Sequence, residues 1–244
     1  MRDRLAAYHG LDRGAASLKV ITTSGDRIQD KPLADFGGKG LFTKEVDEAL
    51  LRGDIALAVH SMKDLPTQLP DGLCLAAVLP RADVRDAFLS PVAPSLAALR
   101  EGAVVGTSSL RRAAQVKRAR PDLRVIDFRG NVQTRLRKLA EGVADATLLA
   151  KAGLDRLDLA AAATSVLSVE DMLPAVAQGA IGVVTRTNDA ETREVLEPLN
   201  DTMTEVAVRC ERAFLAELDG SCRTPIAGLA AIEDGAIRFR GLIL

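Results

Sequence analysis

The sequence predicts an α/β fold with a largely parallel sheet. Short apolar runs typical of strands alternate with amphipathic, charge-rich runs typical of helices up to about residue 186 of the 244. The polar residues between them gather in loops that follow the apolar runs. After about residue 200 this alternation ends, and a long helical pattern leads into two final apolar runs. These observations together favour an α/β body followed by a smaller α+β domain.

The predicted strands are apolar runs that read LKVITT, DIALAVH, AVVG, LRVIDF, ATLLA and AIGVVTR, at residues 18–23, 54–60, 103–106, 123–128, 146–150 and 180–186, with a shorter run, VLP, near 78–80. The predicted helices are the charge-rich runs at 43–53, 109–120, 132–142, 152–157, 191–200 and 204–218. Alternation of the two kinds indicates a largely parallel sheet.

The end of the chain predicts an antiparallel hairpin. The runs IAGLAAI (226–232) and AIRFRGLIL (236–244) flank a Glu-Asp-Gly sequence, which is typical of a tight turn between paired strands. We therefore place a small α+β domain from about residue 201.

Composition excludes several classes of function. The net charge of −1 and an aromatic content of 3% without Trp argue against nucleic-acid binding and base stacking. Three cysteines without a C-x-x-C pair argue against a disulfide framework or a metal site, so we expect a reducing, cytoplasmic location. Neither a signal-peptide core nor an apolar run of membrane-spanning length is visible, so we expect no membrane partner.

Unusual polar loops follow three of the predicted strands, at residues 60–64 (HSMKD), 107–109 (TSS) and 129–131 (RGN). Ligands of α/β sheets bind beyond the carboxyl ends of the strands, in the loops that lead into helices. We therefore expect the three loops to lie on the same edge.

Arginines are concentrated in the middle of the chain. Arg111, Arg112, Arg129 and Arg135 lie on or just after strand-to-helix loops, where helix N-termini attract anions and guanidinium groups match carboxylates. Hydroxyl and backbone N–H groups of residues 107–109 lie at the same place. The pattern favours a small-molecule ligand with several carboxylates or phosphates. Four other cations are interpreted as a solvated helix face: Lys117, Arg118, Arg120 and Lys138.

Three further features leave both a functional and a structural interpretation open. Asp64, beside Lys63, would stay ionised in a cationic cleft and could stabilise a developing cation, although a lone Asp is more often a helix cap or ion-pair partner. Cys222 lies beside Arg223, which favours the thiolate, although a cysteine is more often a buried filler. The glycine-rich segment 37–42 lacks the spacing of a phosphate loop and predicts a mobile lid.

Seven segments resemble those of the porphobilinogen deaminase family, and their order and spacing along the chain also agree with the family. They are GGKGLFTKE, DIALAVHSMKDLPT, VGTSSLRRAAQ, RGNVQTRLRKL, AGLDRL, LPAVAQGAIGV and ERAFLAELDGSCRTPIAG, at 37–45, 54–67, 105–115, 129–139, 152–157, 173–183 and 211–228. The set formed by HSMKD, GTSSLRR and RGN-x-x-T-R is specific, and the resemblance covers nearly the whole chain.

The resemblance implies an α/β fold of two periplasmic-binding-protein-like domains around a cleft, plus a small α+β C-terminal domain. On this sequence, domain 1 would comprise residues 1–80 and 180–200, domain 2 residues 81–179, and an incomplete domain 3 residues 201–244. The implied activity is that of hydroxymethylbilane synthase, a transferase of tetrapyrrole and heme biosynthesis. It condenses four porphobilinogen molecules head to tail with release of ammonia. Relatives are usually monomers, so we expect a monomer.

The resemblance also assigns a cofactor and site residues. A dipyrromethane primer would be joined by a thioether to Cys222, and no metal is implied. Asp64 would stabilise the azafulvene-type cations that form as ammonia leaves and would assist proton transfer, while Lys39 and Phe42 would belong to a lid. The acetate and propionate groups would be held by Ser61, Lys63, Thr107, Ser109, Arg111, Arg112, Arg129, Arg135 and Arg156.

The chain departs from the family pattern at three places. Relatives begin with a strand and an R-x-S-x-L-A-x-x-Q-like segment, whereas this sequence opens inside the following helix, and its third domain stops after the second strand. Asp35 stands where relatives commonly have Lys. We therefore expect the chain as written to have impaired or no turnover.

Two other classes of function fit part of the pattern. A solute-binding or ligand-sensing module could share the two-domain architecture and use the anion site, but it would require neither Asp64 nor Cys222. A basic nucleic-acid-binding protein is the weaker alternative. An affinity for porphobilinogen that does not depend on salt would set it aside, because binding to a phosphate backbone falls steeply with salt.

Overall fold

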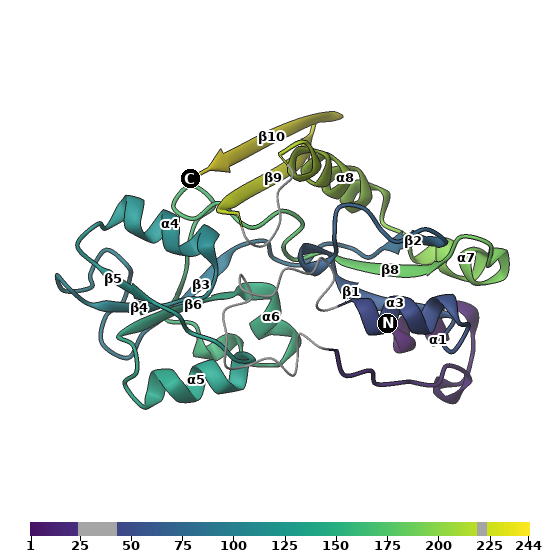
Figure 1. Cartoon of the computed structure of the whole chain (residues 1–244), viewed down its shortest axis with the longest axis horizontal. Coiled ribbons are helices and arrows are strands. Elements are labelled where there is room, and N and C mark those ends of the chain that lie inside the picture. Colours follow the sequence, from purple (N-terminus) through teal and green to yellow (C-terminus); the bar gives the residue numbers. More distant parts are fainter. Residues whose placement is uncertain (24–42, 219–223) are drawn as a thin grey trace. The chain divides into compact units, whose positions relative to one another are not determined.

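The computed structural model describes residues 1–23, 43–218 and 224–244 (Figure 1). These residues form two compact units. Unit 1 comprises Met1–Arg81 and Ala180–Arg209, and unit 2 comprises Ala82–Gly179 and Cys210–Leu244. Each unit contains its own central sheet, so the α/β fold class is confirmed. The three-domain boundaries implied by the family resemblance stay a prediction.

The sheet of unit 1 has three strands in the order β1-β8-β2, and β8 is antiparallel to both neighbours. The strands are β1 (Leu57–Ser61), β2 (Leu73–Val78) and β8 (Ile181–Arg186). The α-helices are α1 (Arg2–His9), α3 (Lys44–Leu51), α7 (Ala190–Leu196) and the first part of α8 (Thr202–Glu217). Short 3-10 turns are η1 (Arg13–Ala15), η3 (Met62–Asp64) and η5 (Glu197–Leu199).

The core of unit 1 joins its helices to the sheet. Leu5 of α1 and Leu196 of α7 pack with Ala77 and Val183 from two adjacent strands, and all four are buried. Burying such side chains removes apolar surface from water, which is the main stabilising contribution of the unit.

The sheet of unit 2 has five strands in the order β5-β4-β6-β3-β7. They are β3 (Asp86–Leu89), β4 (Val104–Gly106), β5 (Arg124–Ile126), β6 (Ala146–Ala150) and β7 (Ser165–Val166). The helices are α4 (Leu110–Ala119), α5 (Val132–Ala140), α6 (Lys151–Arg156) and the short η4 (Ala160–Ala162). Strand β4 is parallel to β5 and β6, whereas β3 is antiparallel to β6 and β7.

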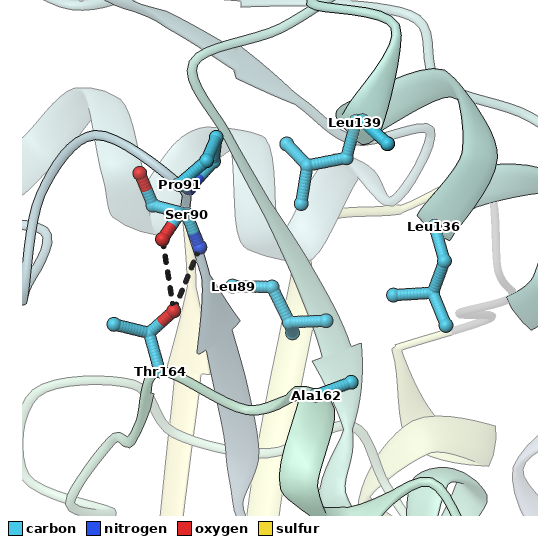
Figure 2. Close-up of a pocket in the computed structure, with 8 residues that line it drawn as sticks. Leu89, Ser90, Pro91, Leu136, Leu139, Ala162 and Thr164 are labelled. Carbon is cyan, nitrogen blue, oxygen red and sulfur yellow. Dashed lines mark hydrogen bonds between the residues drawn. The ribbon is translucent and has the colours of Figure 1, made fainter.

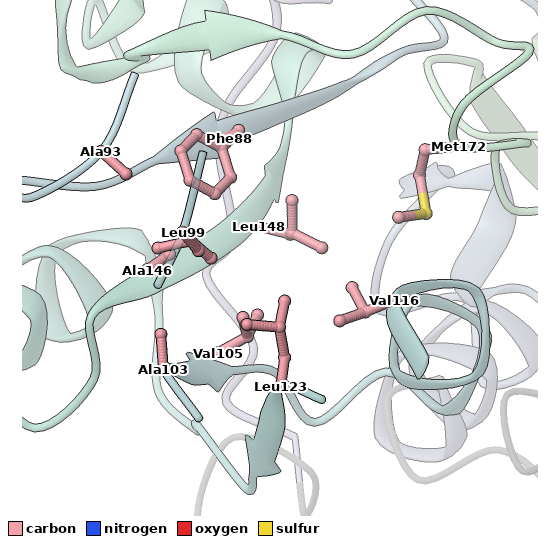
Figure 3. Packing of buried hydrophobic residues seen from close by; sticks show 10 residues of the cluster. All are labelled: Phe88, Ala93, Leu99, Ala103, Val105, Val116, Leu123, Ala146, Leu148 and Met172. Carbon is pink, nitrogen blue, oxygen red and sulfur yellow. The ribbon is translucent and has the colours of Figure 1, made fainter. Parts of the chain in front are cut away.

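Helices cover both faces of this sheet, because successive strand residues point to opposite sides. Phe88 and Leu148 pack with Val116 of α4, in the cluster that Figure 3 shows. On the other face, Leu149 packs in a cluster with Leu139 of α5. The helices α4 and α5 accordingly lie on opposite sides of the sheet (Figure 1).

The last two strands confirm the predicted hairpin. Strands β9 (Ile226–Glu233) and β10 (Ala236–Ile243) are antiparallel and joined by an Asp-Gly turn. The ring of Phe214 in α8 meets Phe239 of β10 edge to face, with 5.0 Å between ring centroids. This contact fastens the hairpin to the C-terminal part of α8.

Two sequence-based expectations about strands are wrong. The sheets are not largely parallel, because among the strands that the structure describes only the pairings of β4 with β5 and β6 are parallel. Strand β8 reaches unit 1 after the whole of residues 82–179, so the local alternation of elements does not fix its direction. The run at 18–23 is not a strand: none of its residues belongs to a β-ladder in the described part of the chain, and Val20 is 92% exposed. β-branched residues favour a strand only where a partner completes its ladder.

Gly182 of β8 allows the turn after β1 to pack closely. A Cβ atom there would collide with the Met62 side chain and would lie 2.8 Å from Cδ1 of Leu75. Met62 is 1% exposed and begins η3, the turn that carries Lys63 and Asp64.

We predict that Gly182→Ala lowers the free energy of unfolding by about 1–3 kcal/mol, because overpacking displaces buried side chains. The matched control is Gly153→Ala in α6, where the added Cβ meets open space. This control should be neutral or stabilising, because alanine favours helix. Chemical denaturation of both variants measures the difference, and a Gly182→Ala protein as stable as the unsubstituted chain would refute the packing argument.

Candidate functional site

The turn after β1 presents Asp64 to solvent. The backbone N–H of Met62 donates to the carbonyl of Ala180 at 3.0 Å, and Leu65 beyond the turn is buried like Met62. Buried residues on either side hold the turn, so Lys63 is half-buried and Asp64 is exposed. Unit 1 thus carries three of the predicted site residues together, Ser61, Lys63 and Asp64, within four consecutive positions from the end of β1 into η3.

His60 precedes this turn and is half-buried. Burial lowers the pKa of His60, although the charge of Asp64 opposes the shift. The Nε2 atom is buried and makes no hydrogen bond in the part of the chain that the structure describes. The chain thus places a half-buried imidazole, whose pKa burial lowers, next to the carboxylate of Asp64.

Loops after β4 and β5 lie on one edge of the sheet in unit 2. Gly106 pairs with Ile126, and the N–H of Thr107 donates to the carbonyl of Ile126 at 2.9 Å. The approach is close, because a Cβ on Gly106 would lie 2.5 Å from the ring of Phe128. The expectation of a shared edge is right for these two loops. It is wrong for residues 60–64, because β1 belongs to the separate sheet of unit 1.

Hydroxyl groups shape the first of these loops. Ser109 is the N-cap of α4, and its Oγ accepts from the N–H of Arg112 at 3.4 Å. Thr107 Oγ1 accepts from the N–H of Ser109 at 3.2 Å. A hydroxyl that accepts in this way still has its O–H to donate. Thr107 and Ser109 are therefore able to donate to an anionic ligand.

Arg111 and Arg112 are buried and share one carboxylate, that of Asp86. Arg112 donates to Asp86 Oδ1 from Nε at 3.2 Å and from Nη2 at 2.7 Å, and Arg111 Nη2 lies 2.8 Å from Oδ2. The two arginines are 4% and 5% exposed and Asp86 is 0% exposed. Each guanidinium also donates to a main-chain carbonyl, that of Leu173 or Leu148.

Burial alone would raise the pKa of Asp86. The charges of Arg112 and Arg111, and the hydrogen bonds from them, outweigh burial and hold that pKa well below its usual range. Gln178 Nε2 adds a hydrogen bond of 3.0 Å to Asp86 Oδ1. Asp86 is therefore an ionised carboxylate with neighbours on both oxygens.

Arg135 and Arg129 extend the positive charge of unit 2. Burial lowers the pKa of Arg135 to about 10, with a further contribution from repulsion by Arg112 and Arg129. Arg135 Nε is buried without a hydrogen-bond partner among the described residues. Arg129 pairs with Asp127 at 3.2 Å, but the Asp127 side chain is 59% exposed. A ligand with several carboxylates fits this cluster, because it would supply the missing acceptors and counter-charge.

Arg156 of α6 is the remaining predicted arginine. Its Nη2 donates to the carbonyl of Gly179 at 2.7 Å, and burial lowers its pKa. Lys39, Phe42 and Cys222 lie outside the described residues, so the lid and the cofactor attachment stay predictions. The predicted site residues that lie in unit 2 are Thr107, Ser109, Arg111, Arg112, Arg129, Arg135 and Arg156.

Sequence reasoning missed Asp86 and Gln178. Asp86 opens the apolar strand DAFL, and a charged residue at a buried strand position requires a partner of opposite charge. That anomaly is a signal that the sequence offered. Gln178 has no comparable signal, since its contact with Asp86 spans 92 positions of the chain.

A small pocket in unit 2 is separate from this cluster. It has a volume of about 220 Å³ and is lined by the residues in Figure 2, with Ser90 and Thr164 hydrogen-bonded at its rim. Leu89 in its lining pairs with Thr147, whereas Asp86 pairs with Ala150 at the carboxyl end of β6. The pocket therefore lies toward the opposite end of the sheet.

Within the described ranges, no helix has the length and apolarity needed to cross a membrane. The similarity to solved structures is distant. A periplasmic substrate-binding protein of an ABC transporter from Coxiella burnetii matches with a TM-score of 0.47 and 14% identity, over 87% of this chain and 92% of that one. A putative methionine-binding lipoprotein from Bacillus subtilis matches with a TM-score of 0.44 and 14% identity, over 67% and 77%.

Sequence comparison gives much stronger matches. Residues 1–194 match the family described as porphobilinogen deaminase, dipyromethane cofactor binding domain, and residues 206–244 match the porphobilinogen deaminase C-terminal domain. The chloroplastic porphobilinogen deaminase of Pisum sativum is 59% identical over 99% of this chain and 67% of its own length. Those of Nitrobacter hamburgensis and Paracoccus denitrificans are 57% and 55% identical over 100% of this chain and 77% and 78% of theirs. The chain therefore belongs to the porphobilinogen deaminase family.

Proposed function

We propose that the chain is a hydroxymethylbilane synthase, a transferase that condenses four porphobilinogen molecules head to tail and releases ammonia. The observation that carries the proposal is the arginine cluster of unit 2, in which the buried Nε of Arg135 has no hydrogen-bond partner among the described residues. Porphobilinogen and the pyrrole chain built from it bear the carboxylates that such a cluster attracts. The type of reaction in this proposal is inferred from membership of the porphobilinogen deaminase family.

Dipyrromethane, when joined to Cys222, supplies the pyrrole end to which each new unit is added. The residues of unit 2 hold carboxylates in this proposal. Arg111, Arg112 and Arg135 offer N–H donors, and the guanidinium planes suit bidentate contact with acetate and propionate groups. Thr107 and Ser109 add hydroxyl donors at the N-terminus of α4, where the helix dipole also favours anions. Arg129 and Arg156 complete the set.

Asp64 is the proposed catalytic residue. When ammonia leaves porphobilinogen, positive charge develops on the pyrrole, and a fixed carboxylate nearby lowers the energy of that charge. The same carboxylate can accept the proton that is lost after a carbon–carbon bond forms. Ser61 and Lys63 on the same turn would bind substrate carboxylates, and Lys39 and Phe42 would belong to a lid.

The same proposal includes a cytoplasmic monomer that binds neither nucleic acid nor membrane. Composition supports the location and the absence of nucleic-acid and membrane partners: the net charge is −1, aromatic residues are 3%, and the three cysteines form no C-x-x-C pair. The monomer is implied by the family resemblance.

The first prediction concerns covalent loading. The intact mass of the purified chain should exceed that of 244 residues by two linked pyrrole units. Cys222→Ser should abolish the added mass, because only this thiolate forms the thioether. Cys74→Ser and Cys210→Ser are the matched controls and should keep it. Added mass that survives in Cys222→Ser would assign the attachment to another residue and contradict the proposal.

The second prediction concerns Asp64. Asp64→Asn should reduce porphobilinogen consumption by about 10²–10³-fold, because the amide cannot stabilise positive charge as the carboxylate does. The melting temperature should change little, since Asp64 is exposed. Asp71→Asn is the matched control, because Asp71 is an exposed acid of the same unit in the turn before β2. Turnover of Asp64→Asn equal to that of Asp71→Asn would remove Asp64 from the mechanism.

A further inference from the structure

Asp86 is a buried carboxylate that the proposed reaction does not use. It is 0% exposed and lies at the start of β3, beneath the N-terminal turn of α4. Its Oδ1 accepts from Arg112 and Gln178, and its Oδ2 faces Arg111. These contacts join the carboxylate to two residues of the proposed site, Arg111 and Arg112, and to the side chain of Gln178.

Two neighbouring arginines buried together repel each other and lose their hydration. One carboxylate between them cancels one of the two charges, so the Arg111–Arg112 pair can stay buried and still present one net positive charge. Each guanidinium is also fixed from a second side by a main-chain carbonyl, Leu173 for Arg111 and Leu148 for Arg112. Their orientation is therefore set before any ligand binds.

Donors remain for a ligand after these contacts. A guanidinium has five N–H groups. Arg112 uses Nε, one N–H of Nη1 and one of Nη2 in hydrogen bonds. Arg111 uses one N–H of Nη1, and its Nη2 forms an ion pair with Asp86 Oδ2. Asp86 thus holds Arg111 and Arg112 in place while other N–H donors of both guanidinium groups remain for a ligand.

Gln178 is itself held in place. It follows Ala177, whose φ of 59° is unusual for a residue other than glycine. The buried carboxylate of Glu211 in α8 accepts from the N–H of Ala177 at 2.6 Å and from the N–H of Ala230 at 2.8 Å. This support fixes the turn from which Gln178 reaches Asp86.

We propose that Asp86 is a positioning residue: it does not touch the ligand, but it holds Arg111 and Arg112 in the orientation in which they bind the carboxylates of the pyrrole chain. The proposal rests on the proposed function for the identity of the ligand. The arrangement of Asp86, Arg111, Arg112 and Gln178 stands on the geometry alone.

The test is Asp86→Asn, which keeps the shape of the side chain and removes its charge. The fraction of protein that carries the two-pyrrole mass should fall about tenfold, and the KM for porphobilinogen should rise about tenfold with a smaller change in kcat. Asp122→Asn is the matched control, because Asp122 pairs with Arg120 at the other end of α4. It should load fully. An Asp86→Asn protein that folds, loads and binds like Asp122→Asn overturns the proposal.

A second variant decides the matter if Asp86→Asn does not fold. Gln178→Met keeps all the charges and removes the Nε2 donor to Asp86. It should fold and lower the loaded fraction about threefold, whereas full loading at an unchanged KM overturns the proposal.

A spectroscopic measurement separates this inference from the proposed function. The Nε–H signal of Arg112 should resist exchange with solvent in the ligand-free, unsubstituted protein and should lose that protection in Asp86→Asn, or in Gln178→Met if the former does not fold. If the unsubstituted chain carries no added mass but shows this difference, the proposed function fails and the positioning role stands. Unchanged protection overturns the positioning role.

Discussion

The buried carboxylate of Asp86 is the constraint on which the site of unit 2 depends. Without it, Arg111 and Arg112 would place two adjacent charges in the interior with only main-chain carbonyls to compensate them. Removing one partner from such a buried arrangement costs about 3–5 kcal/mol. Because the carboxylate lies at the first residue of β3, the position of the arginines is tied to the sheet rather than to a loop. The cluster is thus organised before it meets an anion.

Close backbone contacts place the remaining site elements. In unit 2, the absence of a Cβ on Gly106 lets Phe128 pack against the end of β4, so the loops that bear Ser109 and Arg129 share an edge. In unit 1, the absence of a Cβ on Gly182 lets Met62 pack under the turn that carries Asp64. In both units a rigid strand end, rather than a long loop, supports a polar side chain, which limits the conformational entropy lost on ligand binding.

Much of the fold could be predicted from periodicity. The expected strand at 146–150 coincides with β6, and the helices at 109–120 and 132–142 match α4 and α5 to within two residues. The predictions that were wrong depend on pairing between segments far apart in the chain. They are the direction of β8 and the strand at 18–23, which belongs to no β-ladder of the described residues. The site residues were predicted from the resemblance of motifs to the family. That resemblance identifies Arg111 and Arg112 but not the residues that hold them in place, Asp86 and Gln178. Asp86 could have been suspected as a lone charge opening an apolar strand, whereas its contact with Gln178 exists only in three dimensions.

The state of the Asp86 carboxyl tests this account most directly. Its pKa is held below the usual range in the folded chain, so its ionisation stabilises the fold above the ordinary Asp pKa of about 3.9, and that contribution is lost as the pH falls further. The carbon-13 chemical shift of this carboxyl reports its protonation state. It is followed from about pH 7 to about pH 3 while the protein remains folded. We predict that Asp86 stays ionised at about pH 3, below the ordinary value. Protonation with a midpoint at or above about 3.9 would mean that the arginines do not hold the carboxylate, and it would contradict the account.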